Sequence, residues 1–319
     1  CYSIIDSDKR YNEKIQIQKI QKDTSCEVEY IKLKKEKDKD FFNNLEKLID
    51  YHDSPISTIS YYIHSKISNK ARNDNYKVIF SGTGADEIFT GYYDHFLLFL
   101  NDIKKNTSYQ NELSSWKKNI KPSIRNINLK NAELFHKQPN FRNHIFFEKE
   151  FINQFYKKNI EYSFSEKKYS SNILKNRLLN ELFHESVPVI LKEDDLNSMM
   201  NSIENRSPFL CKKLVSYALS IKNKNYMNNA YSKNILREAM QGILHDDIRL
   251  ERKKIGFNSN IKSITNLNGK ILSEFLSESN YIREIIDLKK IKKIDFSKEI
   301  SNNLSKFLFS LINVKLFLK

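Results

Sequence analysis

Cysteine is scarce in this sequence, and the three that occur stand far apart. Cys1, Cys26 and Cys211 are spread over 319 residues, with no CxxC pair and no close histidines. Disulfide-rich folds and zinc sites both need clustered cysteines, so neither is indicated. We therefore expect isolated, reduced thiols.

Long apolar runs are also missing. No stretch approaches the roughly 20 apolar residues that a membrane-spanning helix needs. Residues 1–10 (CYSIIDSDKR) lack the basic segment followed by an apolar stretch that marks a secretory signal. These absences predict a cytoplasmic protein with no membrane span. The apolar content of 39% still suffices for a core in one large domain or two ordinary ones.

Acidic residues are outnumbered, because 39 Asp and Glu stand against 54 Lys and Arg, for a formal net charge of +15. Such a charge supports binding to polyanions, including nucleotides and nucleic acids. Lysine, asparagine and isoleucine are abundant throughout, however, so compositional bias explains much of the charge. No arginine-and-aromatic module of the known kinds occurs, and we predict no specific nucleic-acid partner.

Short apolar runs alternate with helical patterns in the first third of the chain. The pattern predicts strands over residues 2–5, 28–33 and 77–81, and helices over 11–23, 41–52 and 57–71. Strands separated by helices imply right-handed crossovers, and hence a parallel sheet covered on both faces. We predict an α/β fold with a doubly wound parallel sheet and a largely helical C-terminal part.

Strand patterns fade after this first third. We therefore divide the chain into an α/β core over residues 1–101, a variable and mostly helical region over 102–170, and a helical part over 171–319.

Glycine is rare, with only six in the chain, yet Gly82, Gly84 and Gly91 lie close together after the strand at 77–81. Ligands usually bind in the crevice at the carboxyl ends of parallel strands. Gly82 and Gly84 permit positive φ values and close approach of backbone N–H groups, and a helix start after them favours phosphate. Asp86 suits Mg²⁺, which binds carboxylates together with phosphate oxygens. Ordinary helix capping is the alternative explanation.

Two further motifs accompany this segment, which runs over 76–96 as YKVIFSGTGADEIFTGYYDHF. They are EDDLNSMMNSIENRSPFL over 193–210 and YSKNILREAMQGILHDDIRLERKKIGF over 231–257. In this order the three motifs resemble the synthetase domain of the asparagine synthetase family, from residue 2 to about residue 260. The resemblance implies the α/β ATP-pyrophosphatase fold. It also implies a ligase that uses ATP to turn a carboxylate into an acyl-adenylate, which ammonia, often from glutamine, or another amine then attacks.

The resemblance carries over to individual positions of this sequence. Ser81 and Gly82 match residues that contact the nucleotide through the backbone, and Gly84 lies in the same turn. Ile4 falls on the strand beside the adenine. Asp86 matches the catalytic carboxylate that helps to hold Mg²⁺ on the phosphates, with a helix N-cap as the alternative.

Other matched positions have more open roles. Lys254 occupies the lysine position of an RxKxGF-like segment, where a lysine neutralises charge on the α-phosphate and the departing pyrophosphate. A solvated basic face is the alternative. Glu204 and Arg206, before a proline expected to end a helix, form either a buried structural ion pair or substrate contacts.

Aromatic residues cluster after Gly91. Tyr92, Tyr93 and Phe96 either line an acceptor site or, more commonly for such residues, belong to the core.

The sequence departs from the family near the acceptor pocket. Thr83 stands where asparagine-forming enzymes usually have a glutamate, and threonine cannot serve as a base at neutral pH. Cys211 replaces an aspartate after PFL, and Ser54 replaces a glutamate. The acceptor carboxylate therefore stays open between aspartate, a sugar acid and another small acid.

The family's pyrophosphate-binding loop, an SGGxDS segment after the first strand, does not occur in these residues. The segment over 2–13 (YSIIDSDKRYNE) resembles the family's second strand and the acidic, tyrosine-containing segment after it. Cys1 is too close to that strand to be the nucleophile of an amino-terminal glutaminase domain. We expect an N-terminally truncated chain, inactive as this fragment. The alternative is a non-catalytic or partner-dependent nucleotide-binding protein of the same fold.

Overall fold

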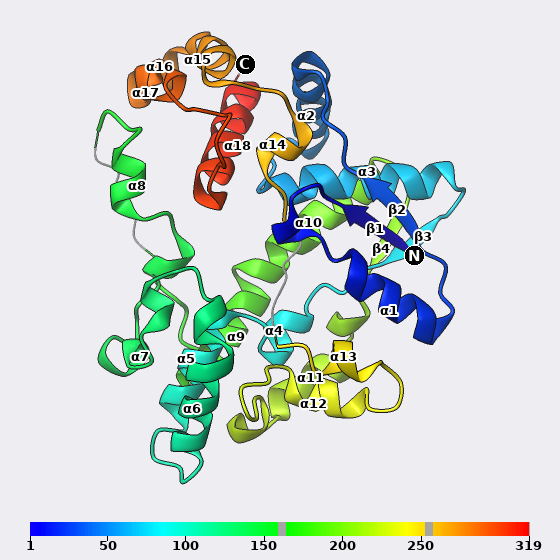
Figure 1. The fold of residues 1–319 in the computed structure, drawn as a ribbon, viewed down its shortest axis with the longest axis vertical. Helices are drawn as coiled ribbons and strands as arrows, with labels where there is room; N and C mark the ends of the chain where they lie inside the picture. Colours follow the sequence, from blue (N-terminus) through cyan, green and yellow to red (C-terminus); the bar gives the residue numbers. More distant parts are fainter. Residues whose placement is uncertain (159–163, 253–257, 319) are drawn as a thin grey trace.

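The computed structural model describes residues 1–158, 164–252 and 258–318. It is a mixed α/β structure with short strands near its middle and helices elsewhere (Figure 1). The helices over residues 269–317 lie near the helix over 38–52 at one end of the molecule, and the helices over residues 93–137 lie at the other end.

The strands of the described chain form two parallel pairs. β1 (Tyr2–Ile5) pairs with β2 (Glu29–Lys32), and β3 (Val78–Phe80) pairs with β4 (Glu204–Arg206). The predicted α/β class with parallel strands is confirmed. The doubly wound sheet is not confirmed, because within the described residues these pairs are two separate two-stranded sheets.

Helices separate the strands of the first third, as predicted. They are α1 (Lys14–Thr24), α2 (Asp38–His52) and α3 (Ile59–Asn73). Phe41 and Leu45, one turn apart on α2, are fully buried, which is the spacing from which this helix was predicted.

From Asp102 onward the described chain is mostly helical, as predicted, with β4 as the exception. The remaining helices are α4 (Ala85–Phe89), α5 (Tyr93–Asp102), α6 (Tyr109–Asn119), α7 (Leu134–Lys137), α8 (Lys149–Asn153), α9 (Ile173–Phe183), α10 (Ser186–Met199), α11 (Lys212–Ser220), α12 (Asn234–Ala239), α13 (Asp246–Arg249), α14 (Ile261–Ile264), α15 (Gly269–Ser277), α16 (Asn280–Ile285), α17 (Leu288–Lys292) and α18 (Asn302–Phe317).

Buried apolar side chains gather in two clusters. One joins β1, α2 and α3 to the C-terminal helices α14 to α18, and the other joins α4 to α7 with α9 and α11. Helix α10 contacts α2 and α3 on one side and α9 on the other, so it links the clusters. Each cluster draws on more than one of the three predicted segments, whose boundaries stay a prediction.

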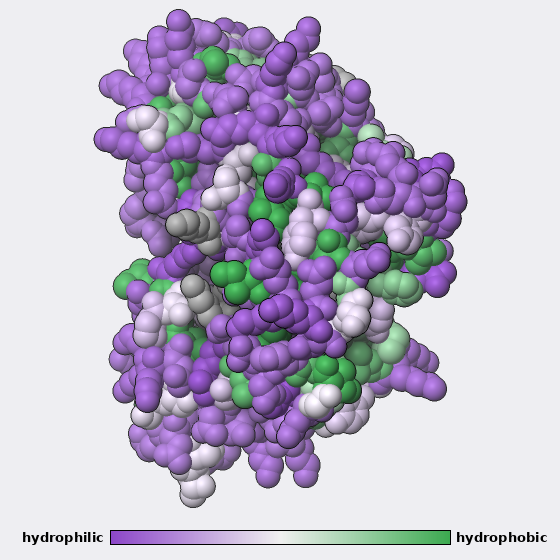
Figure 2. Space-filling model, turned by 45° about the vertical axis from the view of Figure 1, so that its right-hand side comes forward, coloured by the Kyte–Doolittle hydropathy of each residue, from purple (hydrophilic) through white to green (hydrophobic). Residues whose placement is uncertain are grey.

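The surface is mainly polar. Figure 2 shows hydrophilic residues over most of one face, with hydrophobic residues gathered near its middle. Among the helices of the described chain, none combines the length and apolar character needed to cross a lipid bilayer.

Two of the cysteines are close together. The sulfur atoms of Cys1 and Cys26 lie 2.9 Å apart, at the start of β1 and in the connection that leads to β2. The expectation of isolated thiols is therefore wrong for this pair. Sequence separation hid the contact, because the parallel pairing of β1 with β2 brings the two segments together.

Candidate functional site

A cavity of about 700 Å³ lies between β1 and β3. Ile4 from β1 and Ser81 and Gly82 from the turn after β3 all line it. The structure thus brings together three of the residues predicted to bind ATP. The volume falls within the range of roughly 300–1,000 Å³ that is typical of small-molecule sites.

The strands that border the cavity present open backbone edges to it. The amide of Glu29 donates to the carbonyl of Cys1 (2.8 Å), so the alternation of a parallel ladder points the backbone groups of Tyr2 and Ile4 away from β2. The same alternation applies to β3 beside β4. Within the described chain, no strand pairs with either of these edges. Phe80 of β3 also lines the cavity and is 70% exposed, although it is apolar.

The glycines of the turn have different roles. A Cβ on Gly82 would meet no atom within 4 Å, and its φ is not positive, so that part of the prediction is wrong. Gly82 instead lines the cavity, where its missing side chain leaves open space. Gly84 has a φ of 94°, as predicted, and a Cβ there would come within 2.3 Å of Leu210. Gly84 is not among the cavity-lining residues, so it shapes the turn.

Asp86 also lies away from the cavity lining. It is in the short helix α4, and its Oδ1 forms an ion pair with Lys233 Nζ at 2.5 Å. The carboxylate packs so closely over Gly91 that a Cβ there would come within 1.7 Å of Oδ1. A Mg²⁺ ion at Asp86 would have to compete with Lys233. The described residues therefore fit ATP in the cavity better than they fit Mg²⁺ at this carboxylate.

A chain of polar side chains crosses one wall of the cavity. Ser81 Oγ donates to Thr83 Oγ1 (3.0 Å), which donates to Asp194 Oδ2 (3.1 Å). The other oxygen of Asp194 lies 3.3 Å from Nδ1 of His64. With Nδ1–H donated to the carboxylate, Nε2 of the imidazole can accept a proton. The hydroxyl protons of Ser81 and Thr83 are donated within this chain, so their oxygen atoms can accept hydrogen bonds from a ligand.

Asp194 and His64 were not predicted as site residues. Asp194, on α10, belongs to the motif over 193–210, so a position-by-position reading of that motif could have found it. His64, on α3, gave no signal, because it is an isolated histidine in an amphipathic helix.

In the motif over 193–210, the expectation of a buried ion pair is wrong. Glu204 and Arg206 are not a buried pair at a helix end: they lie on β4 and pair with each other at 2.8 Å, with side chains 58% and 54% exposed. Both project from the same face of a strand, because they are two residues apart. The core alternative is confirmed for Phe96, which is buried among the helices of the middle of the chain.

Three other positions were named from the sequence: Lys254, Cys211 and Ser54. Lys254 lies outside the described residues, so its role stays a prediction. Cys211 is exposed, and Ser54 donates its hydroxyl to the carbonyl of His52 (3.2 Å).

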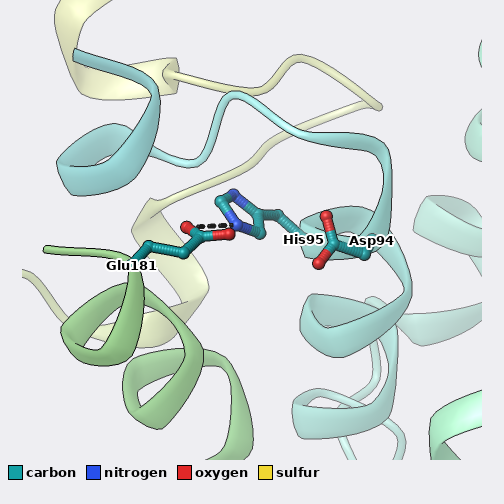
Figure 3. A group of neighbouring side chains, drawn as sticks. All are labelled: Asp94, His95 and Glu181. Atoms are coloured by element: carbon teal, nitrogen blue, oxygen red, sulfur yellow. Dashed lines mark hydrogen bonds and ion pairs between the residues drawn. The ribbon is translucent and has the colours of Figure 1, made fainter. Parts of the chain in front are cut away.

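A buried charge cluster between α5 and α9 is the group in the described chain best suited to hold a metal. Ligand atoms of Asp94, His95 and Glu181 lie within 4.8 Å of one another. Figure 3 shows the imidazole of His95 pointing at Glu181, with Nε2 at 2.9 Å from the carboxylate. Arg177 already supplies a cation, at 3.0 Å from Glu181 and 3.4 Å from Asp94.

The electrostatics of this cluster are those of a satisfied ionic network. Burial alone would raise the pKa of Asp94, but the neighbouring His95, His144 and Arg177 hold it well below its usual range. Burial lowers the pKa of His95, but Glu181 and Asp94 more than offset this and raise it. A metal ion would have to displace Arg177, so we interpret the cluster as structural.

Sequence comparisons agree with the motifs. A sequence model of the family described as asparagine synthase matches residues 1–304. The chain is also 25% identical over 310 residues to the glutamine-hydrolysing asparagine synthetase 1 of Bacillus subtilis (strain 168). That match covers 86% of this chain and 46% of the relative, so the chain spans about half of the relative's length. With nearly all of its length matched, the chain belongs to the asparagine synthase family.

Proposed function

We propose that this chain is the ATP-binding portion of an amide-forming ligase, which activates a carboxylate as an acyl-adenylate and transfers the acyl group to ammonia or an amine. The cavity between β1 and β3 carries the proposal, because it joins Ile4 to Ser81 and Gly82 at the carboxyl end of β3. Open carboxyl ends of parallel strands are where α/β proteins bind nucleotides.

ATP is proposed to lie across this cavity. The adenine packs against Ile4, and the phosphates approach the turn at Ser81 and Gly82, where the missing side chain of Gly82 leaves space. Lys254 is our proposed stabiliser of the charge on the departing pyrophosphate. Asp86 is our proposed Mg²⁺ ligand; the ion would take the place of Lys233 at this carboxylate and would neutralise charge on the phosphates.

A proton must leave the attacking amine, and Thr83 cannot take it. The Asp194–His64 pair at the same wall supports a different acceptor, because the imidazole is held by a buried carboxylate and lines the cavity. We propose that Nε2 of His64 takes this proton. The Bacillus subtilis relative is glutamine-hydrolysing, which supports glutamine as the source of ammonia, through a glutaminase domain that the given sequence does not show.

Partner dependence is the second candidate function. The unpaired edges of β1 and β3 border the proposed ATP site, and the site is therefore open along two strands in the described chain. In this alternative the chain binds nucleotide but forms no product without a further polypeptide.

The test uses the intact protein, because this fragment is expected to be inactive: ATP binding by calorimetry, with and without Mg²⁺, followed by assays for AMP and pyrophosphate with aspartate and other small carboxylates. We expect Mg²⁺-dependent binding that Asp86→Ala loses and that Glu284→Ala, at an exposed position on α16, keeps. No ATP binding would overturn the proposal. Binding without AMP formation from any carboxylate would favour the partner-dependent candidate.

A further inference from the structure

The sulfur atoms of Cys1 and Cys26 are close enough to bond. They lie 2.9 Å apart, whereas a disulfide bond is about 2.05 Å long, so a shift of roughly 1 Å joins them. We propose that these residues form a reversible disulfide that fastens the start of β1 to the connection before β2. The third cysteine, Cys211, lies at the start of α11 and serves as an internal control.

The backbone on both sides of the pair holds the sulfur atoms together. The backbone nitrogen of Cys1 donates to the carbonyl of Glu27 (2.7 Å), and the amide of Glu29 donates to the carbonyl of Cys1 (2.8 Å). Ser25, after the end of α1, has a left-handed φ of 51°, which reverses the chain and turns Cys26 toward β1. The juxtaposition therefore follows from the fold of this segment, and not from two mobile side chains that happen to meet.

Small thiol reagents can reach the pair. Cys1 is exposed and Cys26 is part-exposed, and Cys26 opens onto a separate cavity of about 730 Å³ along α1. Lys19 and Lys22 also line that cavity.

The reaction is a thiol–disulfide exchange with a small disulfide oxidant, for example oxidised glutathione. The thiolate of Cys26 attacks one sulfur of the oxidant, which gives a mixed disulfide and releases one glutathione. The thiolate of Cys1 then attacks the Cys26 sulfur and releases the second glutathione. Both cysteine protons end on the released thiols, the protein loses two electrons, and the oxidant gains them.

The bond would act on the wall of the proposed ATP site. Cys1 and Ile4 line the same cavity, and a Cys1–Cys26 bridge closes a segment that contains β1 and α1. Oxidation would therefore fix the strand that is proposed to carry the adenine contact. This consequence rests on the proposed function, whereas formation of the bond does not.

The experiment equilibrates the protein with mixtures of oxidised and reduced glutathione, then counts free thiols and records the intact mass. We expect two of three thiols to disappear, with a loss of about two mass units and a peptide linking Cys1 to Cys26 after digestion. Cys211→Ser keeps this behaviour, whereas Cys1→Ser leaves only a glutathione adduct on Cys26. From the loop length, oxidation should raise the melting temperature by about 5 °C.

Three free thiols under fully oxidising conditions would overturn the proposal, and so would a bond that involves Cys211. Thiol counting on the unsubstituted protein needs no variant, so a misfolded substitution cannot obscure the result. ATP affinity measured on the oxidised and reduced forms separates the two proposals. If neither form binds ATP, the proposed function fails while the disulfide stands.

Discussion

Gly84→Ala should destabilise the protein, whereas Gly82→Ala should not. Gly84 has a φ of 94°, which costs an alanine about 1–2 kcal/mol, and its new Cβ would come within 2.3 Å of Leu210. Relief of that overlap costs about 1–3 kcal/mol more. Together these give a loss of about 2–5 kcal/mol in the free energy of unfolding, or about 3–7 °C in melting temperature for a chain of this size.

Gly82→Ala is the matched control, because its Cβ would enter open space at an ordinary φ. Urea unfolding, followed by circular dichroism, should show parent-like stability for Gly82→Ala. ATP affinity should fall in the same variant, since the added methyl group occupies the proposed phosphate approach. The reasoning is refuted if Gly84→Ala unfolds within about 0.5 kcal/mol of the parent, or if both variants lose stability equally.

Three more substitutions test the charges of the structure. Burial raises the pKa of Asp102 to about 6. The contribution of Asp102 to the free energy of unfolding therefore falls as pH rises from about 4 to about 6, and Asp102→Asn should be about 2 kcal/mol more stable than the parent at pH 7 but not at pH 4. Arg177→Met leaves several buried carboxylates without their cation, so urea unfolding at pH 7 should show a loss of about 3–5 kcal/mol in the free energy of unfolding. Lys233→Met removes the ion pair of Asp86, so titration should show ATP binding half-saturated at a lower Mg²⁺ concentration; an unchanged value would contradict Asp86 as the ligand.

Local patterns predicted the helices and strands of the first third. The helices follow from the period of their hydrophobic residues, and the strands β1 to β3 follow from short apolar runs. β4 could not be found in this way, because its three residues, Glu204 to Arg206, are polar and two of them are exposed. It is a strand because β3 offers an edge to pair with, and pairing between segments this far apart leaves no periodic signal in either.

In the candidate site, too, some residues could be predicted from the sequence and others depend on long-range packing. Ile4, Ser81 and Gly82 were predicted because the resemblance assigned them to one ligand, and the structure places them around one cavity. The Asp194–His64 contact joins residues 130 apart in the chain, on α10 and α3. It depends on how those two helices pack, which neither segment encodes alone.

The open edge of β3 allows one further test, at Phe80. Its side chain is 70% exposed, so a charged replacement loses little buried area, although the residue looks like part of a core strand from sequence alone. Exposed apolar edge strands promote pairing between molecules, and a lysine there opposes it. Phe80→Lys should therefore change the free energy of unfolding by less than about 0.5 kcal/mol and reduce self-association in sedimentation velocity. Tyr281→Lys, at a position 67% exposed on α16, is the matched control and should leave association unchanged. A loss of about 3–5 kcal/mol, as for a buried phenylalanine, would mean that the edge of β3 is covered in solution, and with it one wall of the proposed ATP site.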